Sequence, residues 1–143
     1  MRLTTLTDFS LRMLTHLAIR PERRATIAEV ARAYQVSETH LMKVAHQLGQ
    51  AGYVRTLRGR GGGIVLARPA AMISVGEVVR CMEPDMAIVP CFADNPCVIR
   101  PACRLRHTLH EARAAFFAVL DQTSIADLAQ PAGELRELLG LAA

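Results

Sequence analysis

The chain has 143 residues, of which 51% are apolar and 21% are charged, and its formal net charge is +4. This length and composition predict one globular domain, or one small domain with an appendage, and exclude a multidomain enzyme, a collagen-like chain and an acidic tail protein. The charge is divided unevenly: residues 1–68 hold 11 basic and 4 acidic side chains, whereas residues 69–143 hold 6 basic and 9 acidic ones. The basic half therefore predicts contact with a polyanion.

The beginning of the chain does not have the pattern of a secretory signal, because Asp8 and Arg12 interrupt its apolar residues. No run approaches the roughly 18 apolar residues that a membrane span needs. We therefore expect a cytoplasmic protein without a membrane contact. In that compartment the four cysteines stay reduced and are free, metal-bound or redox-active.

Three helices are predicted over the first third of the chain. Apolar residues at helical spacing indicate an amphipathic helix over about 5–20. Thr26 and Glu29 have the spacing of a capping box at the start of a second, short helix. Ser37 is expected to cap a third helix, which Gly52 closes.

The second and third helices, joined by a tight turn, have the pattern of a helix-turn-helix. In such a pair the third helix enters the major groove, and its N-terminal residues meet bases or phosphates. The candidates for these contacts are Ser37, Thr39, His40 and Lys43. A small helical pair with a solvated polar face is the alternative.

A hairpin is predicted next, with strands over 53–58 and 64–66 and the glycine-rich segment Gly59 to Gly63 between them. Glycine lets the backbone approach DNA closely, and Arg58 and Arg60 can reach phosphates or a narrow minor groove. A nucleotide-binding loop would need Lys followed by Ser or Thr after the glycines, and that pair is missing. The hairpin therefore predicts the wing of a winged helix-turn-helix, with a plain flexible hairpin as the alternative.

The second half contains a proline-punctuated loop from Glu83 to Cys103, after a short helix that begins with a capping box at Ser74. Cys91, Cys97 and Cys103 follow one another at equal spacing in this loop. A loop of this length without secondary structure is usually functional or disordered, and three thiols can wrap a metal centre. Structural zinc prefers tighter Cys pairs, whereas iron–sulfur clusters usually have four Cys ligands.

The fourth ligand must therefore come from outside the triplet. Cys81, His107, Asp94 and a group from elsewhere in the fold or from another subunit are the candidates. Cys81 is also compatible with a small buried residue of its helix, and His107 with a solvated position.

A long helix is predicted over about 104–122. Its apolar residues alternate by four and three in a heptad seam made of Leu105, Leu109, Ala112, Phe116 and Val119. We expect this seam to join two copies, because a helix-turn-helix usually reads a palindromic operator through two-fold symmetry. Packing within one chain is the alternative. One or two helical turns over 124–129 and a terminal helix over 134–139 complete the chain.

These elements predict a mainly α fold with a small β-hairpin wing. Residues 1–70 form a winged helix-turn-helix DNA-binding region, and residues 71–103 a helix and a cysteine-rich cluster-binding loop. Residues 104–143 form the dimerisation helix and the C-terminal segment.

Three segments together resemble the Rrf2 family of winged-helix regulators: residues 1–12, the wing from Arg58 to Gly63, and the cysteine triplet. The resemblance extends to about Ala129. Residues 94–97 and 102–106 are most similar to the nitric-oxide-sensing repressors of that family. The resemblance implies a homodimer whose long helices cross, with an iron–sulfur cluster near each end.

In the nitric-oxide-sensing members, three loop cysteines hold a 4Fe–4S cluster, and an aspartate near the N-terminus of the partner subunit is the fourth ligand. Asp8 stands at the matching place. Other members use a histidine three residues beyond the last cysteine, where this chain has Arg106. His107 is one step further, and one step turns a helical side chain by about 100°. The implied ligands are therefore Cys91, Cys97, Cys103 and Asp8, with 4Fe–4S as the expected cluster and 2Fe–2S as the alternative.

A carboxylate ligand suits a sensor, because oxygen is a hard donor on iron that otherwise prefers thiolate, so this bond should exchange readily. We expect a dimeric transcriptional repressor that binds double-stranded DNA and whose cluster reacts with nitric oxide. A cluster regulator that senses iron, oxygen or redox state, and a cluster-free thiol-switch or zinc-stabilised repressor, are the alternatives. An enzyme or carrier is disfavoured, because the sequence has no nucleophile elbow and no paired acid and base.

Overall fold

The computed structural model describes residues 2–93 and 97–141. Within these ranges the chain is mainly helical, with one antiparallel two-stranded sheet. The elements are α1 (Thr5–Ala18), α2 (Ile27–Tyr34), α3 (Glu38–Gln50), β1 (Val54–Leu57), β2 (Gly63–Leu66), α4 (Val75–Met82), α5 (Arg104–Asp121), α6 (Ile125–Leu128) and α7 (Ala132–Leu138). Three short 3₁₀ turns are η1 (Ala70–Met72), η2 (Pro90–Phe92) and η3 (Arg100–Ala102).

One apolar core joins α1, α2, α3 and α4. Most of the periodic apolar residues of the first three helices are buried, among them Leu14 of α1, Val30 of α2 and Leu48 of α3. Others in the same pattern are half-buried: Leu6, Phe9, Ile27, Tyr34 and Ala45. The same core continues through Val78 of α4 to Ile125 of α6. The helix-turn-helix is therefore held rigidly against the rest of the body, because protein interiors pack as densely as organic crystals.

The three predicted helix caps have different outcomes. The capping box of Thr26 and Glu29 is complete, with both reciprocal hydrogen bonds present. Ser74 accepts a hydrogen bond from the Glu77 backbone N–H, but the Glu77 carboxylate pairs with Arg68, so only half of that box forms. Ser37 stands at the start of α3 and makes no capping hydrogen bond, so its predicted capping role is wrong.

The wing is a regular hairpin in which Val54 pairs with Leu66 and Leu57 with Gly63. Its second strand is also tied to the segment before α2, since the Ala25 and Ile64 backbones exchange two hydrogen bonds of 3.1 and 2.7 Å. A Cβ atom at Gly63 would lie 2.8 Å from the Ala25 carbonyl oxygen. Glycine at this position therefore allows the wing to lie directly against the body.

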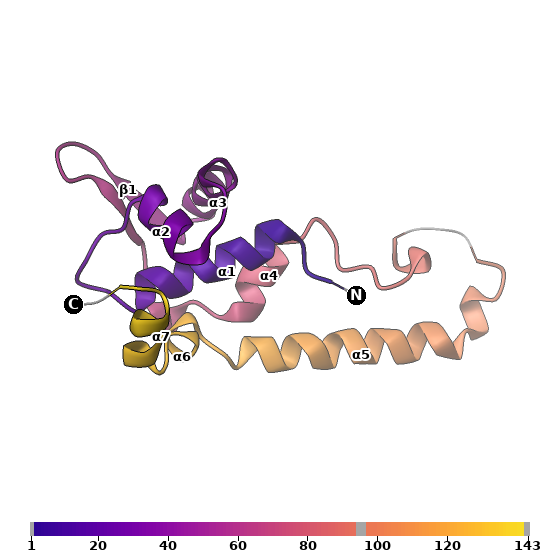
Figure 1. Cartoon of the computed structure of the whole chain (residues 1–143). Helices are drawn as coiled ribbons and strands as arrows, with labels where there is room; N and C mark the ends of the chain where they lie inside the picture. Colours follow the sequence, from indigo (N-terminus) through magenta and orange to yellow (C-terminus); the bar gives the residue numbers. More distant parts are fainter. Residues whose placement is uncertain (1, 94–96, 142–143) are drawn as a thin grey trace.

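Figure 1 shows the C-terminal end of α5 beside the body, with the rest of the helix extending away from it and the loop from α4 reaching its far end. Near its C-terminal end α5 is held to α4 by the ion pair of Arg80 with Asp121. The Arg80 guanidinium also lies 4.1 Å from the centroid of the Phe117 ring. A Cβ atom at Gly76 would overlap an Asp121 carboxylate oxygen, so the absence of a side chain at this position leaves room for the pairing.

Three details of the second half differ from the prediction. The cysteine loop is not free of secondary structure, because η2 begins at Pro90 and η3 contains Pro101, and proline fixes a backbone angle that suits a tight turn. Cys81 is exposed on α4 rather than buried. The terminal helix begins at Ala132, two residues earlier than predicted, directly after Pro131. No helix of the described ranges has the length and apolarity that crossing a membrane requires.

Candidate DNA-binding surface and metal centre

The predicted DNA-reading residues lie at the exposed start of α3. Ser37, Thr39, His40 and Lys43 are all exposed, whereas Leu41 of the same helix is buried in the core. Because the Ser37 hydroxyl makes no capping bond, it is free to meet a ligand. The His40 ring lies 6.4 Å from the Phe9 ring of α1, so one side of this histidine contacts the body.

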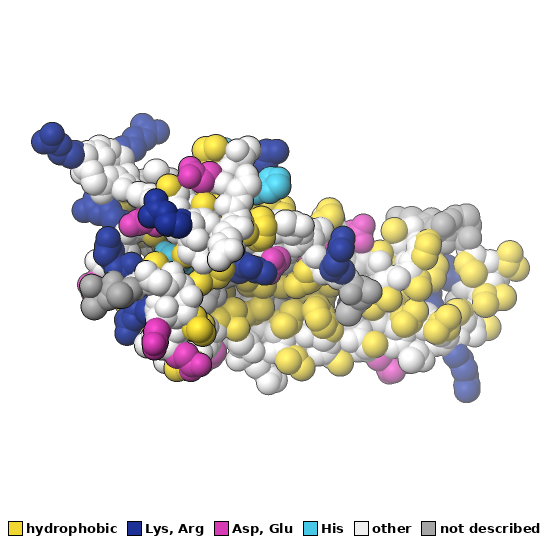
Figure 2. All heavy atoms as spheres, in the orientation of Figure 1, with side chains coloured by type: hydrophobic (Ala, Val, Ile, Leu, Met, Phe, Trp, Pro, Cys, Tyr) yellow, Lys and Arg dark blue, Asp and Glu magenta, His cyan; other side chains and the backbone are white. Residues whose placement is uncertain are grey.

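The wing presents the other predicted contacts. Arg58 and Arg60 are exposed, and Figure 2 shows basic side chains projecting from the end of the hairpin. Gly59 and Gly61 on either side of Arg60 have φ angles of +95° and +73°, which side-chain-bearing residues rarely adopt. The glycines therefore determine where the Arg60 side chain is presented.

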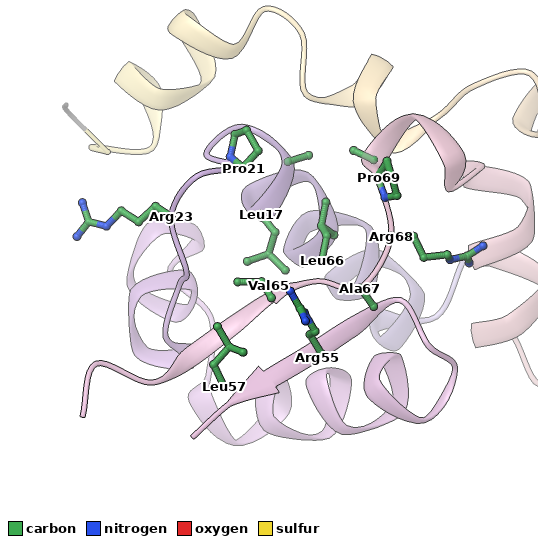
Figure 3. Close-up of a pocket in the computed structure, with 12 residues that line it drawn as sticks. Leu17, Pro21, Arg23, Arg55, Leu57, Val65, Leu66, Ala67, Arg68 and Pro69 are labelled. Atoms are coloured by element: carbon green, nitrogen blue, oxygen red, sulfur yellow. The ribbon is translucent and has the colours of Figure 1, made fainter. Parts of the chain in front are cut away.

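Arg55 is a further basic residue of the wing, and sequence reasoning did not single it out. It is exposed on β1 opposite Val65. Figure 3 shows it in a groove of about 410 Å³ between the wing and the end of α1, where Arg23 and Arg68 point away from the centre. The available signal was its charge, within a strand already predicted to belong to the wing.

The cysteine triplet lies at the end of the molecule farthest from the wing (Figure 1). All of its thiols are free, with Cys97 exposed and Cys91 and Cys103 half-buried. Cys103 stands at the start of α5, where its Sγ accepts a 3.4 Å hydrogen bond from the Arg106 backbone N–H. Cys91 lies in η2, on the opposite branch of the loop.

The beginning of this loop is tied to the beginning of α1. The Glu83 carboxylate accepts hydrogen bonds from the Thr4 backbone N–H at 2.7 Å and from the Thr4 hydroxyl at 3.1 Å. Asp8 lies one turn further along α1 and pairs with Arg12 at 3.0 Å. The Asp8 side chain, which is the predicted carboxylate ligand, is 46% exposed, and its partner within the chain is the Arg12 guanidinium.

Three free cysteines and a carboxylate offer donor atoms that are chemically suited to iron. The buried Nε of Arg106 has no hydrogen-bond partner among the described residues, so this N–H can accommodate an acceptor such as a sulfur atom. The chemistry of the donors thus fits an iron–sulfur cluster. Within residues 2–93 and 97–141, however, no three His, Cys, Asp or Glu side chains converge on one metal position.

The other candidates for the fourth ligand have different surroundings. His107 is 78% exposed and lies 3.3 Å from Glu111 of the next turn, which agrees with a solvated position. Cys81 is on α4, outside the loop. Asp94 lies outside the described residues.

The predicted heptad seam is left open by the single chain. All of α5 falls within the described residues, and none of its side chains is buried. Leu105 and Val119 of the seam are each 65% exposed. A different face of the helix, with Phe117 and Leu120, packs against the core. Leu105, Ala112 and Val119 are therefore available to a partner, whereas Leu109 and Phe116 are half-buried within the chain.

The sequence pattern of the Rrf2 family, described as that of an iron-dependent transcriptional regulator, matches residues 3–131. The chain belongs to the Rrf2 family. The HTH-type transcriptional regulator NsrR of Bacillus subtilis is 49% identical to it over 142 residues, which are 97% of each chain.

Two solved structures have the same fold. CymR, the global cysteine regulator of B. subtilis, superposes with a TM-score of 0.76 at 28% identity, covering 90% of this chain and 96% of CymR. IscR of T. potens superposes with a TM-score of 0.75 at 24% identity, covering 94% of this chain and 90% of IscR. The predicted Rrf2 membership and winged-helix fold are confirmed, and the chain is a DNA-binding transcriptional regulator rather than an enzyme.

Proposed function

We propose that this chain is a homodimeric repressor whose operator binding is controlled by an iron–sulfur cluster that reacts with nitric oxide. In this proposal residues 1–70 read DNA, residues 71–103 hold the cluster, and residues 104–143 join the two subunits. The observation that carries the proposal is the presence of three free thiols on one loop between α4 and α5. The resemblance of residues 94–97 and 102–106 to the nitric-oxide-sensing repressors of the family supports nitric oxide as the signal. The chain is also similar over nearly its full length to the transcriptional regulator named NsrR.

The proposed ligands are Cys91, Cys97 and Cys103 of one subunit and Asp8 of the other, with a 4Fe–4S cluster favoured over 2Fe–2S. When bound, the cluster supplies iron that can react with a small molecule. Within residues 2–93 and 97–141 no three possible ligands converge, so the three cysteines would have to approach one another when the cluster binds, and Asp8 would come from the second subunit. Asp8 would have to exchange its Arg12 partner for the metal.

A series of contacts connects Asp8 to the recognition helix. Asp8 pairs with Arg12, whose guanidinium lies 5.9 Å from the ring centroids of both Phe9 and Tyr34. The Phe9 ring in turn lies 6.4 Å from that of His40 on α3. A change in the partner of Asp8 would therefore act on side chains that support the DNA-reading surface. These side chains would couple the cluster site to the DNA-binding site, as allosteric control requires.

Dimerisation through the open seam of α5 would place two recognition helices in one symmetric assembly. A palindromic operator in double-stranded DNA is the partner that such symmetry fits. The exposed Leu105 and Val119 provide apolar area that would be buried in the dimer. The cytoplasm is the compartment in which this reaction and the free thiols are compatible.

The test begins with protein prepared without oxygen, in which iron, acid-labile sulfide and the Mössbauer spectrum are measured. A pool of random-sequence DNA duplexes is used to select the operator, and its retention is compared for intact, nitric-oxide-treated and chelator-stripped protein. We expect cluster-dependent binding that nitric oxide abolishes. Protein that contains zinc, or no metal at all, would contradict the proposal of an iron–sulfur cluster. Operator binding that responds only to iron depletion or to oxygen would favour a regulator that senses iron, oxygen or redox state.

Serine variants of the cysteines provide the matched series. Cys91→Ser, Cys97→Ser and Cys103→Ser should each lose the cluster, because each removes a soft ligand. Cys81→Ser, in which an exposed thiol outside the loop is replaced, should keep it. Loss of the cluster in the Cys81 variant would identify that thiol as the fourth ligand in place of Asp8.

A further inference from the structure

The Phe92 ring contacts side chains on one face of α5 and so connects the Cys91 end of the cysteine loop with the Cys103 end. Phe92, directly after Cys91, lies with its centroid 5.8 Å from the Arg106 guanidinium and 4.9 Å from that of Arg113. The His110 ring meets Phe92 edge-on at 6.3 Å. Both guanidinium distances are within the range of a cation–π interaction.

The three partners of Phe92 share one side of α5, because residues 106, 110 and 113 are spaced by four and three. The same side holds the loop at a second point, where the Arg113 guanidinium donates to the Met86 carbonyl oxygen at 3.5 Å. The heptad seam follows a different side of the helix, so these contacts do not compete with the proposed dimer interface.

Arg106 touches both thiol-bearing ends of the loop. Its backbone N–H donates to Cys103 Sγ, and its side chain lies against the residue that follows Cys91. The positions of Cys91 and Cys103 relative to one another therefore depend on Phe92 and Arg106. The two arginines also place positive charge at this point.

We infer that Phe92, Arg106 and Arg113 form a cationic clamp that positions Cys91 beside Cys103 and stabilises the negative charge of the ligated cluster. The inference rests on the proposed function, since it concerns the same metal centre. Thiolate and carboxylate ligands make such a cluster anionic, and nearby charge and hydrogen bonds to sulfur set its stability and potential. These residues are positioning residues and are not themselves ligands.

The first test uses the metal-free protein. The alkylation rate of Cys91 is measured by mass spectrometry, with the exposed Cys81 of the same molecule as the internal reference. Phe92→Leu keeps an apolar side chain but removes the ring face, and we expect Cys91 to react about threefold to tenfold faster. Phe92→Trp should restore the original rate. Equal Cys91 alkylation rates in the parent protein, Phe92→Leu and Phe92→Trp would contradict the proposed clamp.

The second test uses the cluster-loaded protein and follows cluster loss to an iron chelator and the reduction potential. Phe92→Leu and Arg106→Gln should lose the cluster several-fold faster, and Arg106→Gln should also lower the potential, because less positive charge then favours the oxidised form. Arg100→Gln removes an exposed arginine from the same loop and should change neither value. An unchanged potential together with an unchanged rate in Arg106→Gln would remove Arg106 from the clamp.

The two tests separate the inference from the proposed function. Protein that takes up no cluster contradicts the proposed function, while the alkylation rates still decide whether the clamp positions Cys91. Protein that takes up a cluster with equal stability in all variants supports the proposed function and overturns the clamp.

Discussion

Replacing Asp8 with alanine separates the two roles that this carboxylate can have, as a partner of Arg12 and as a metal ligand. The side chains of Asp8 and Arg12 are 46% and 44% exposed. Such a pair contributes about 0.3–0.5 kcal/mol, and a carboxylate in the first helical turn adds up to about 1 kcal/mol. The melting temperature of metal-free Asp8→Ala should therefore fall by only about 2–5 °C.

Cluster retention should respond much more strongly than folding. Even outer partners of metal ligands are typically worth about 10–100-fold in affinity, so loss of a direct ligand should speed cluster loss at least about tenfold. Arg12→Ala is the matched control, because it breaks the same ion pair and keeps the carboxylate. Asp8→Cys supplies a soft ligand and should hold the cluster longer and answer nitric oxide more slowly.

The assay is the decay of cluster absorbance in a chelator, followed without oxygen for the three variants and the parent protein, with melting curves of the metal-free forms alongside. Equal decay for Asp8→Ala and Arg12→Ala would refute the reasoning, since only one of them lacks the carboxylate. Asp8 would then be a surface residue of α1 whose ion pair accounts for all of its effect.

Four further outcomes are expected. Arg60→Ala should weaken operator binding at every sequence and reduce the slope of log affinity against log salt by about 1, as measured by fluorescence anisotropy. Val119→Asp should shift the protein from dimer to monomer in analytical ultracentrifugation, whereas His107→Asp, on another side of α5, should leave the dimer intact. Burial, and secondly the charge of Arg20, lower the pKa of His16 below its ordinary 6.5. The unfolded chain therefore binds the proton more readily, so stability should fall as the pH drops below about 6.5, and His16→Phe should remove that dependence in chemical denaturation. Gly63→Ala should destabilise the fold by about 1–3 kcal/mol, because its Cβ meets backbone that cannot easily move.

The helices and the wing could be predicted from the sequence because their determinants are local. Thr26 and Glu29 are three residues apart, so a complete capping box follows from the sequence alone. The glycines around Arg60 indicated a turn that other residues cannot adopt easily. The apolar spacing of α5 indicated its seam, and the exposure of Val119 agrees with a surface that is not used within one chain.

Contacts between distant residues could not be predicted in this way. The Glu77 carboxylate pairs with Arg68 and does not complete the capping box of its own helix. Asp121 pairs with Arg80, which is 41 positions away. The exposure of Cys81, by contrast, has a local signal that the prediction overlooked, because the buried Val78, Val79 and Met82 mark the apolar face of α4 and Cys81 lies outside it.

The amino-acid order by itself therefore determined the elements, the basic reading surface and the supply of three thiols, because each depends on residues that are neighbours along the chain. Only the tertiary structure decided that Phe92 lies between two arginines of α5 and that the start of the cysteine loop is tied to α1 through Thr4 and Glu83. The physical reason is that the energy of a long-range contact depends on the packing that brings its two partners together, and no local pattern records that packing.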